Sequence, residues 1–549
     1  MDKLKPKLFS VMKTYTKEQF VKDVVAGIIV AIIALPLSIA LAIASGVTPT
    51  AGIYTAIIAG FLVAFLGGSR VQIAGPTAAF ATIVAGIVAK DGTQGLMIAT
   101  IMAGILLIIM GFLRFGVLLK FIPYTITTGF TAGIAVTLFI GQIKDFAGIS
   151  YLNGEKPIET SEKVMAIVNN IKTVNVWALV IGFVSLAILI LWPKVSKKIP
   201  GSLIAVIVSA MIVKFAGLNV NTIGSLYPDL SNKLPSLTVT LETFTLTNIR
   251  GQLSNAVTIA ILAGIESLLS AVVADSMINS KHRSNMELVA QGVANIGSAC
   301  FGGIPATGAI ARTAANIKNG GRTPIAGMVH SVTLVLVLVL LMPYAKLIPM
   351  PCIAAILFQV AYNMSGWRTF VNLCKSSPKS DILVLLTTFI LTVVFDLVVA
   401  IEIGILLAAV LFMKRMSDVT NVEGWVYPDD EDDPDSISLR VVPKNVLVYE
   451  ISGPMFFGAA DKILRISVND DTKVLVIRMR GVNAIDATAM HNLEQLFDTF
   501  TSKGIKFVFS HVNDQPMQVM TKAGFVEKVG IDNFQPHIDE ALKRAESLQ

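Results

Sequence analysis

Two charged residues lie inside apolar stretches of the sequence, and each could bind an ion. Glu266 stands in the middle of the apolar run 258–270, where a carboxylate can bind a proton or Na⁺. Ser270 follows one helical turn later and could share a cation with Glu266. Arg312 lies in the apolar segment 307–318, where its positive charge would attract an anion. The alternatives are a structural hydrogen bond for Glu266 and extension of the Arg312 side chain to the membrane surface.

Two short apolar segments, 77–89 and 307–318, each follow an extended stretch that contains glycine and proline. Because neither segment is long enough to cross a bilayer, we expect two half-helices buried inside the protein. Free N–H groups and the positive dipole ends at their N-termini would form an anion site. Small residues would let the backbone approach a ligand, although tight helix packing also favours them. These small residues are Ala74, Gly75, Thr77, Ala78 and Ala79, then Ala306, Thr307, Gly308, Ala309 and Ala311.

The composition shows which kind of protein must position these residues. Of 549 residues, 54% are hydrophobic and 15% charged, and the mean hydropathy is +0.71. Soluble domains contain about 25% charged residues, so most of this chain must be embedded in a membrane. Residues 1–420 carry 31 basic and 17 acidic side chains, whereas residues 421–549 carry 13 and 20. The first part therefore has the composition of a polytopic membrane domain, and the second that of an acidic soluble domain.

Twelve apolar runs are candidate membrane spans. They are 24–45, 51–66, 95–113, 124–143, 174–192, 200–217, 254–276, 287–301, 322–343, 349–363, 381–396 and 398–413. With the two half-helices they give fourteen membrane segments. Six lysines precede the first span, and they hold the N-terminus in the cytoplasm by the positive-inside rule.

The loop charges agree with this count. Basic residues gather in alternate loops: Arg70; Arg114 and Lys120; Lys194, Lys197 and Lys198; Lys281 and Arg283; Lys318 and Arg322; Arg368, Lys375 and Lys379; Lys414 and Arg415. An even number of crossings then places the C-terminal part in the cytoplasm. Asp396, Glu402, His282 and His330 are expected at the membrane interface.

Equivalent features recur about 230 residues apart. Pro76 and Pro305 are separated by 229 residues, and Pro36 and Glu266 by 230. Seven segments lie between the two sets, and this odd number makes the two halves inverted relative to each other. Inverted repeats with broken helices are typical of secondary transporters. Chance spacing in a glycine-rich membrane protein is the alternative.

The C-terminal part alternates between strand and helix patterns. Strands are predicted at 445–452, 473–479 and 505–511, with helices near 459–467, 487–502, 515–523 and 535–546, so a small α/β domain is expected. We place a cytoplasmic segment at 1–23, the membrane domain at 24–416, an acidic linker at 417–435 and the soluble domain at 436–549. The three cysteines form no disulfide framework, and no catalytic triad or metal cluster is evident, so an enzyme is not expected.

The chain resembles the SulP (sulfate permease-like) anion-transporter family over nearly its whole length. The matching stretches include 34–36, 44–47, 52–54, 74–78, 264–269, 287–292 and 301–313, and the C-terminal part resembles that family's STAS domain. The resemblance implies fourteen segments in two inverted seven-segment repeats, divided into core and gate. It also implies an elevator-like motion and a homodimer.

The resemblance also assigns residues. Thr77, Ala78, Ala309 and Arg312 would face the anion, with Pro36 nearby, and Glu266 would handle a cation. In related STAS domains a Ser/Thr-rich turn after an Asp can be phosphorylated. Here that turn begins at Asp486 and offers Thr488, while one hydroxyl position is Ala.

We therefore expect a secondary transporter for bicarbonate, sulfate or a C4-dicarboxylate, coupled to H⁺ or Na⁺, in the plasma (inner) membrane. No other cofactor and no nucleic acid are expected. An uncoupled exchanger or channel with regulation by the STAS domain is one alternative. A membrane-anchored scaffold, whose STAS domain binds a cytoplasmic protein, is another.

Overall fold

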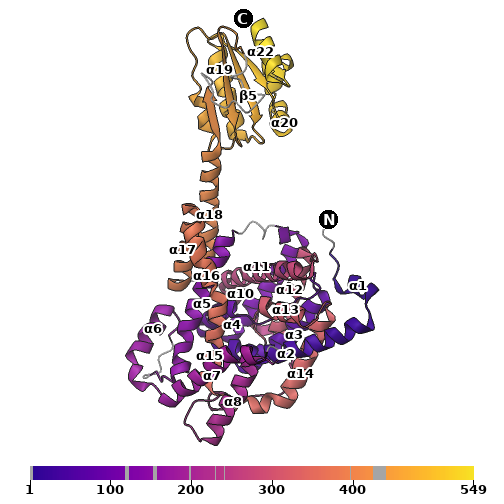
Figure 1. Cartoon of the computed structure of the whole chain (residues 1–549), viewed down its shortest axis with the longest axis vertical. Helices are drawn as coiled ribbons and strands as arrows, with labels where there is room; N and C mark the ends of the chain where they lie inside the picture. The colour runs from indigo at the N-terminus through magenta and orange to yellow at the C-terminus, as the bar shows by residue number, and fades with distance from the viewer. Residues whose placement is uncertain are drawn as a thin grey trace. The chain divides into compact units, whose positions relative to one another are not determined.

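The computed structural model describes residues 4–117, 123–151, 157–196, 199–228, 230–239, 241–395, 397–424 and 441–549. The chain forms two compact units, residues 1–405 and 406–549 (Figure 1). Lys120, Lys197, Lys198 and Asp396 lie outside the described residues, as does the 425–435 part of the predicted linker.

The first unit is helical. Its elements are α1 (Leu8–Val11), α2 (Lys17–Ala44), α3 (Pro49–Leu66), β1 (Ala74–Gly75), α4 (Ala78–Phe112), α5 (Tyr124–Ala147), α6 (Thr160–Asn169), α7 (Val176–Val195), α8 (Gly201–Phe215), α9 (Ile223–Leu226), α10 (Leu246–Gly251), α11 (Leu253–Ile278), α12 (Ser284–Cys300), β2 (Thr307–Gly308), α13 (Ile310–Lys318), α14 (Ile325–Ala345), α15 (Met350–Ser365), α16 (Trp367–Ser376) and α17 (Lys379–Val394). Helix α18 (Leu397–Val419) begins in this unit and ends in the second.

A helix is present at every position where the sequence predicts a span or a half-helix. Among the described residues, α2, α3, α4, α5, α7, α11 and α14 are long and apolar enough to cross a bilayer. The full count of fourteen membrane segments remains a prediction. Helix α4 contains both the first half-helix and the third predicted span, and Gly92 interrupts it with φ 71° and ψ −174°, a backbone conformation that suits glycine.

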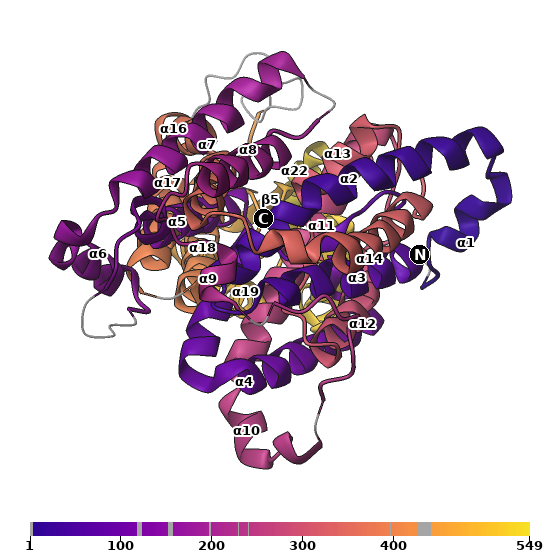
Figure 2. The same ribbon diagram turned by 90° about the horizontal axis from the view of Figure 1, so that it is seen from below.

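The helices of the first unit pack as two bundles (Figure 2). The core bundle consists of α2, α3, α4, α11, α12, α13 and α14, and the flanking bundle consists of α5, α7, α8, α15 and α17. Contacts within each bundle are extensive, whereas those between them are sparser and involve mainly α2 and α4 with α5, α8 and α15. Buried apolar side chains, among them Ile39, Leu138 and Ile353, fill the region where the bundles meet.

The N-terminal segment 4–16 lies against loops of the core bundle. The backbone N–H of Lys7 donates to the Gly67 carbonyl, 2.8 Å away, and Arg283 donates to the Lys5 carbonyl over 2.7 Å. These bonds join the segment to the loop after α3 and to the loop between α11 and α12. The segment therefore ties together two loops that are far apart in the sequence.

A buried carboxylate, that of Asp23, holds the start of α2. It accepts hydrogen bonds from the Tyr15 hydroxyl (3.0 Å), the Arg322 backbone N–H (2.9 Å) and the Thr323 hydroxyl (2.5 Å). Partial burial and the Asp23 charge raise the pKa of Tyr15 to about 12. Because all of these groups donate to the carboxylate, Asp23 links α2 to the loop between α13 and α14.

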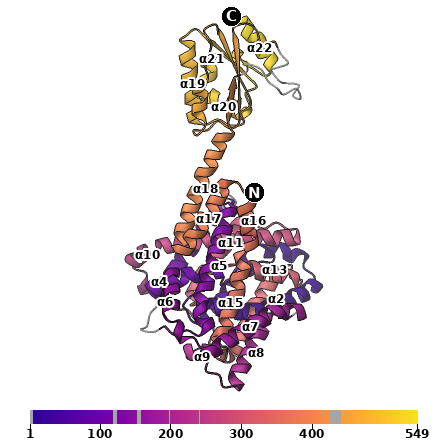
Figure 3. The same cartoon turned by 60° about the vertical axis from the view of Figure 1, so that its left-hand side comes forward.

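The second unit contains a five-stranded sheet in the order β3-β4-β5-β6-β7 (Figures 1 and 3). Strand β3 runs antiparallel to β4, and the remaining neighbours are parallel. The elements are β3 (Asn421–Gly424), β4 (Val446–Ser452), a 3₁₀ helix (Ala460–Arg465), β5 (Val474–Gly481), α19 (Ala487–Thr501), β6 (Lys506–Ser510), α20 (Asp514–Lys522), α21 (Phe525–Val529), β7 (Phe534–Gln535) and α22 (Ile538–Ser547). Residues 417–424, which the sequence assigns to the linker, thus contain the end of α18 and an edge strand.

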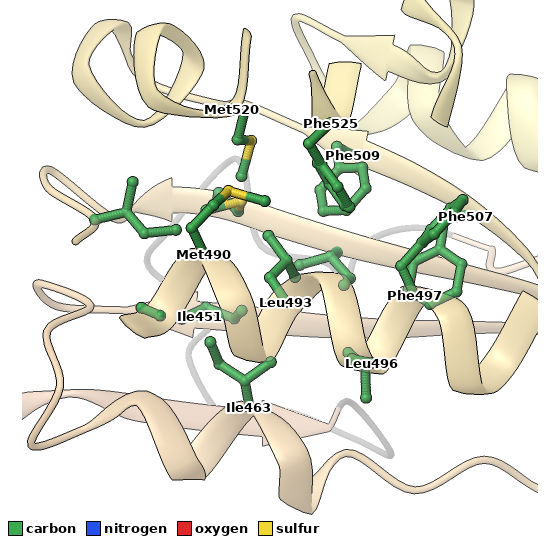
Figure 4. Packing of buried hydrophobic residues seen from close by; sticks show 14 of the residues in the cluster. Ile451, Ile463, Met490, Leu493, Leu496, Phe497, Phe507, Phe509, Met520 and Phe525 are labelled. Carbon is green, nitrogen blue, oxygen red and sulfur yellow. The ribbon is translucent and has the colours of Figure 1, made fainter. Parts of the chain in front are cut away.

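Side chains along each strand point alternately to the two faces of the sheet, and both faces of this sheet are apolar. One face packs against α19, α20 and α21, and Figure 4 shows Leu493 and Phe497 of α19 close to Phe507 and Phe509 of β6. The other face, which includes Val476, packs against α22. Helices on both faces of a largely parallel sheet give the predicted α/β domain.

Candidate functional site

The two half-helices are brought together by strand pairing. Strand β1 pairs antiparallel with β2, with Ala74 opposite Gly308 and Gly75 opposite Thr307. All four residues are buried. Because α4 and α13 follow these strands within a few residues, their N-termini lie in one place in the core bundle.

Both N-termini lack a side-chain cap. Thr77 is the N-cap of α4 and Ala309 the N-cap of α13, and neither side chain bonds to its own first turn. The first N–H groups of a helix have no intrahelical partner and carry the positive end of the dipole. The predicted start at residue 307 is wrong, since Thr307 and Gly308 are held in β2 and α13 begins at Ile310.

Arg312 joins the two half-helices. Its side chain is 3% exposed, and Nη2 donates to the Pro76 carbonyl over 2.8 Å. A Cβ atom at Gly75 would lie 2.5 Å from Arg312 Nη1, so the guanidinium occupies space that only glycine leaves open. The arginine therefore places a positive charge beside the turn between β1 and α4.

Helix α11 supplies polar side chains next to both strands. The Thr77 hydroxyl donates to Glu266 Oε2, 2.9 Å away. The Ser267 hydroxyl lies 2.8 Å from that of Thr307 and accepts from the Gly308 N–H over 3.0 Å. Glu266 is partly buried, and among the described residues no ion pair joins it to Arg312.

Further side chains fix the stretch that leads into β1. Glu287 is fully buried, and its Oε2 accepts from the backbone N–H groups of Gly68 (2.7 Å) and Ser69 (3.0 Å). Its Oε1 accepts from Gln72 Nε2 at 2.9 Å. This carboxylate therefore fixes the conformation of the loop before β1, and it acts on the site only through that loop.

The stretch that leads into β2 is held in a similar way. Asn295 accepts from the Ala306 N–H at 2.9 Å and donates to its carbonyl at 3.0 Å. Thr55, on α3, accepts from the Ile304 N–H over 2.7 Å. These bonds leave the backbone of both strands with little freedom.

Comparison with known proteins adds to this geometry. Residues 20–388 match the model of the sulfate permease family. The chain belongs to the sulfate permease family. Residues 438–541 match the STAS domain model, so this member carries a C-terminal STAS domain.

Two relatives extend along nearly the whole chain. One, named "Putative sulfate transporter YvdB" and from Bacillus subtilis, is 40% identical over 96% of this chain and 98% of its own length. The bicarbonate transporter BicA of Picosynechococcus is 31% identical over 95% and 94% respectively. The solved structure of the murine anion transporter Slc26a9 has a TM-score of 0.88 over 99% of this chain and 94% of its own, and at 17% identity it shows a common fold.

The structure places the other residues predicted for this sulfate permease family member as follows. Ala78 opens α4 and is buried. Ser270 is buried and donates to Thr313 Oγ1 over 3.4 Å, on the side of α13. Pro36 is buried inside α2. Thr488 lies in the STAS unit, exposed in the first turn of α19, where Asp486 caps the helix.

His330 is fully buried in α14, and its predicted place at the membrane interface stays a prediction. His282 is partly buried, and Asp275 lies 2.7 Å from its Nδ1. Ser267 and Thr313, which bond to other residues of the site, were not predicted from the sequence. Ser267 follows the mid-span Glu266, and that position was the available signal for it.

Proposed function

We propose that this protein is a secondary active transporter that binds a small anion where the N-termini of α4 and α13 meet. The observation that carries the proposal is the β1–β2 pairing, which joins two uncapped helix N-termini with Arg312 between them. Backbone N–H groups, a helix dipole and a buried positive charge all favour an anion. The substrate would be bicarbonate, sulfate or a C4-dicarboxylate, and the names of YvdB and BicA support the first two.

We assign coupling to Glu266. Its carboxylate lies beside the site through Thr77, without a cationic partner among the described side chains. A carboxylate in such a position can bind H⁺ or Na⁺ together with the anion. Either ion would reduce the charge that crosses the membrane with the substrate.

An elevator-like movement of the core bundle fits the packing. The site lies entirely on core-bundle elements, and strand pairing and side-chain bonds join those elements firmly. Contacts with the flanking bundle are sparser and largely apolar, which suits sliding. In this scheme the flanking bundle would stay fixed in a homodimer in the plasma membrane, with both termini in the cytoplasm.

The test is uptake of radiolabelled sulfate, bicarbonate and fumarate into proteoliposomes, with and without a pH or Na⁺ gradient. The wild type should concentrate at least one anion under a gradient. Arg312→Ala should weaken apparent anion affinity by about tenfold or more, since hydrogen bonds to charged groups are worth about 1.5–3 kcal/mol. Arg312→Lys should recover part of that loss, and Lys318→Ala, on the exposed end of the same helix, is the control.

Two results would contradict the proposal. Gradient-independent flux that never exceeds equilibrium would favour an uncoupled exchanger or channel. Unchanged anion affinity in folded Arg312→Ala protein would remove Arg312 from the site.

A further inference from the structure

The N-terminal segment 4–16 exposes both apolar and basic side chains. Phe9 is 48% exposed and Met12 is 46% exposed, although both are large apolar residues. The exposed basic side chains are those of Lys5, Lys13 and, at the first position of α2, Lys17. None of these three ammonium groups has a hydrogen-bond or ion-pair partner among the described residues. The anion site uses none of these side chains.

Contacts with α3 show at which level of the membrane this segment lies. Helix α3 is long and apolar enough to cross a bilayer, and at about 1.5 Å per residue its length is close to the thickness of the hydrocarbon core. Its last turns expose Phe61 and Phe65, whose rings stack at 6.2 Å, and the ring of Phe9 meets that of Phe65 edge-on at 6.2 Å. The segment therefore lies beside one end of α3, where the bilayer meets water. Figures 1 and 2 show α1 at the outer edge of the first unit, so lipid can reach it.

The other lysines of residues 4–22 are already bonded. Lys7 Nζ donates to the Lys281 carbonyl over 2.7 Å, and Lys22 pairs with Glu18 at 2.6 Å. Glu18 is the one acidic residue in this stretch of the sequence. The three exposed lysines therefore carry a positive charge that no carboxylate of this stretch neutralises.

Exposed lysines together with exposed apolar side chains favour a lipid surface over a soluble anion. Aromatic side chains concentrate at membrane interfaces, and apolar side chains of a surface segment insert at the boundary between headgroups and acyl chains. The lysine stems can lie along this apolar surface while their ammonium groups reach the lipid phosphates. A soluble polyanion would also be attracted by the lysines, but it would leave Phe9 and Met12 in water. The predicted cytoplasmic side fits as well, because cytoplasmic leaflets carry anionic lipids.

We propose that residues 4–17 form a binding surface for anionic phospholipids. The apolar side chains of this surface enter the headgroup region beside α3, and its three exposed lysines attract the lipid phosphates. The backbone of the segment is bonded to the loop after α3 and to the loop between α11 and α12, so the bound lipid lies against the core bundle. This inference does not depend on the proposed anion site.

Quenching of a tryptophan by brominated lipids tests the proposal without any transport measurement. Full-length Phe9→Trp protein is placed in phosphatidylcholine nanodiscs that contain the same fraction of either brominated phosphatidylglycerol, whose headgroup is anionic, or brominated phosphatidylcholine. Quenching beyond that of the wild type, whose own tryptophans give the background, measures the local enrichment of each lipid at position 9. Phosphatidylglycerol should be enriched at least about fivefold over phosphatidylcholine, the factor for one lysine at about 1 kcal/mol near an anionic surface.

A second probe position covers the case in which Phe9→Trp does not fold. Met12→Trp serves this purpose, since Met12 is exposed and lies outside the contact between Phe9 and Phe65. The same preference for phosphatidylglycerol is expected there.

Removal of the three lysine charges should abolish the preference. In the protein that carries the tryptophan probe, Lys5→Gln, Lys13→Gln and Lys17→Gln together should bring the ratio of the two enrichments to about one. Salt at 1 M should also lower the ratio, because the screening length falls to about 3 Å.

A matched control removes the same amount of charge from exposed positions elsewhere in the first unit. Lys90→Gln, Lys172→Gln and Lys214→Gln together should leave the ratio unchanged. Equal enrichment of the two lipids with all lysines present would overturn the proposal, and so would the absence of quenching by either lipid at both probe positions. Both results are independent of whether the protein transports an anion.

Discussion

Glu266→Gln separates the coupling role of this carboxylate from its structural role. The substitution keeps the shape of the side chain and removes its charge and its ability to bind a proton. Glutamine can still accept the hydrogen bond from the Thr77 hydroxyl that Glu266 Oε2 accepts at 2.9 Å. The variant therefore imitates the protonated carrier with little change in local packing.

The structural cost should be small. A hydrogen bond to a charged group contributes about 1.5–3 kcal/mol and one between neutral groups about 0.5–1.5 kcal/mol, so the bond from Thr77 should weaken by about 1 kcal/mol. The functional effect should be large. A gradient of one pH unit supplies about 1.4 kcal/mol per proton, which supports about tenfold accumulation of anion at one proton per anion. Glu266→Gln should accumulate none beyond equilibrium.

The assay compares gradient-driven uptake with anion exchange in proteoliposomes of the same preparation. Exchange should persist in Glu266→Gln, and pH-driven accumulation should disappear. If Na⁺ is the coupled ion, Na⁺-dependent binding should be lost as well, since an amide is a poorer cation ligand than a carboxylate. Glu402→Gln removes an exposed carboxylate from α18 and is the matched control. A Glu266→Gln variant that concentrates anion as well as the wild type would show that Glu266 is structural.

Three further predictions concern strand β2, the start of α2 and the STAS domain. Gly308→Ala would press its new Cβ atom against Gln72 Nε2, so we expect weaker anion binding in a binding assay. The STAS domain should stay folded, and the circular dichroism spectrum of the protein should therefore be unchanged. Asp23→Ala leaves neutral donors at the start of α2 without an acceptor and should lower the melting temperature by several degrees, because a buried polar group left without its partner costs about 1–3 kcal/mol. The contribution of Tyr15, whose folded pKa is about 12, should be full below pH 10 and disappear as the pH rises through 12. Deletion of 436–549 should leave a membrane unit that can be extracted and gives a single size-exclusion peak; aggregation alone would show that the STAS domain supports its fold.

Much of the fold follows from local pattern. The apolar runs correspond to helices because a membrane segment must form its backbone hydrogen bonds within itself. The length of an apolar run is then enough to locate the helix. The strands and helices of the STAS domain were predicted from the spacing of apolar residues, which alternates in strands and follows the helical period in helices. Strands β4, β5 and β6 and helix α19 lie where these patterns occur. Strand β3 was not predicted, since its four residues lie in a stretch of acidic composition and are ordered by pairing with β4.

The site was less predictable because non-local contacts form it. Thr77 could be placed at a helix start from Pro76 and the small residues after it. Thr307 could not be placed in a strand, since its partner Gly75 is more than two hundred residues away. His330 illustrates a different limit: hydropathy identifies an apolar helix but does not tell which side of it faces the protein.

The bonds around the site link the two halves of the membrane unit to each other. The stretch before β2 is held by Thr55 from α3, and the loop before β1 is held by Glu287 from α12, so each half fixes the backbone of the other. Neither helix N-terminus can therefore move away from its partner without breaking strand pairing and buried hydrogen bonds together. If the site is to face both sides of the membrane in turn, we expect the core bundle to move as one body, and the apolar contacts around Ile39 and Ile353 offer a surface without hydrogen bonds along which it could slide.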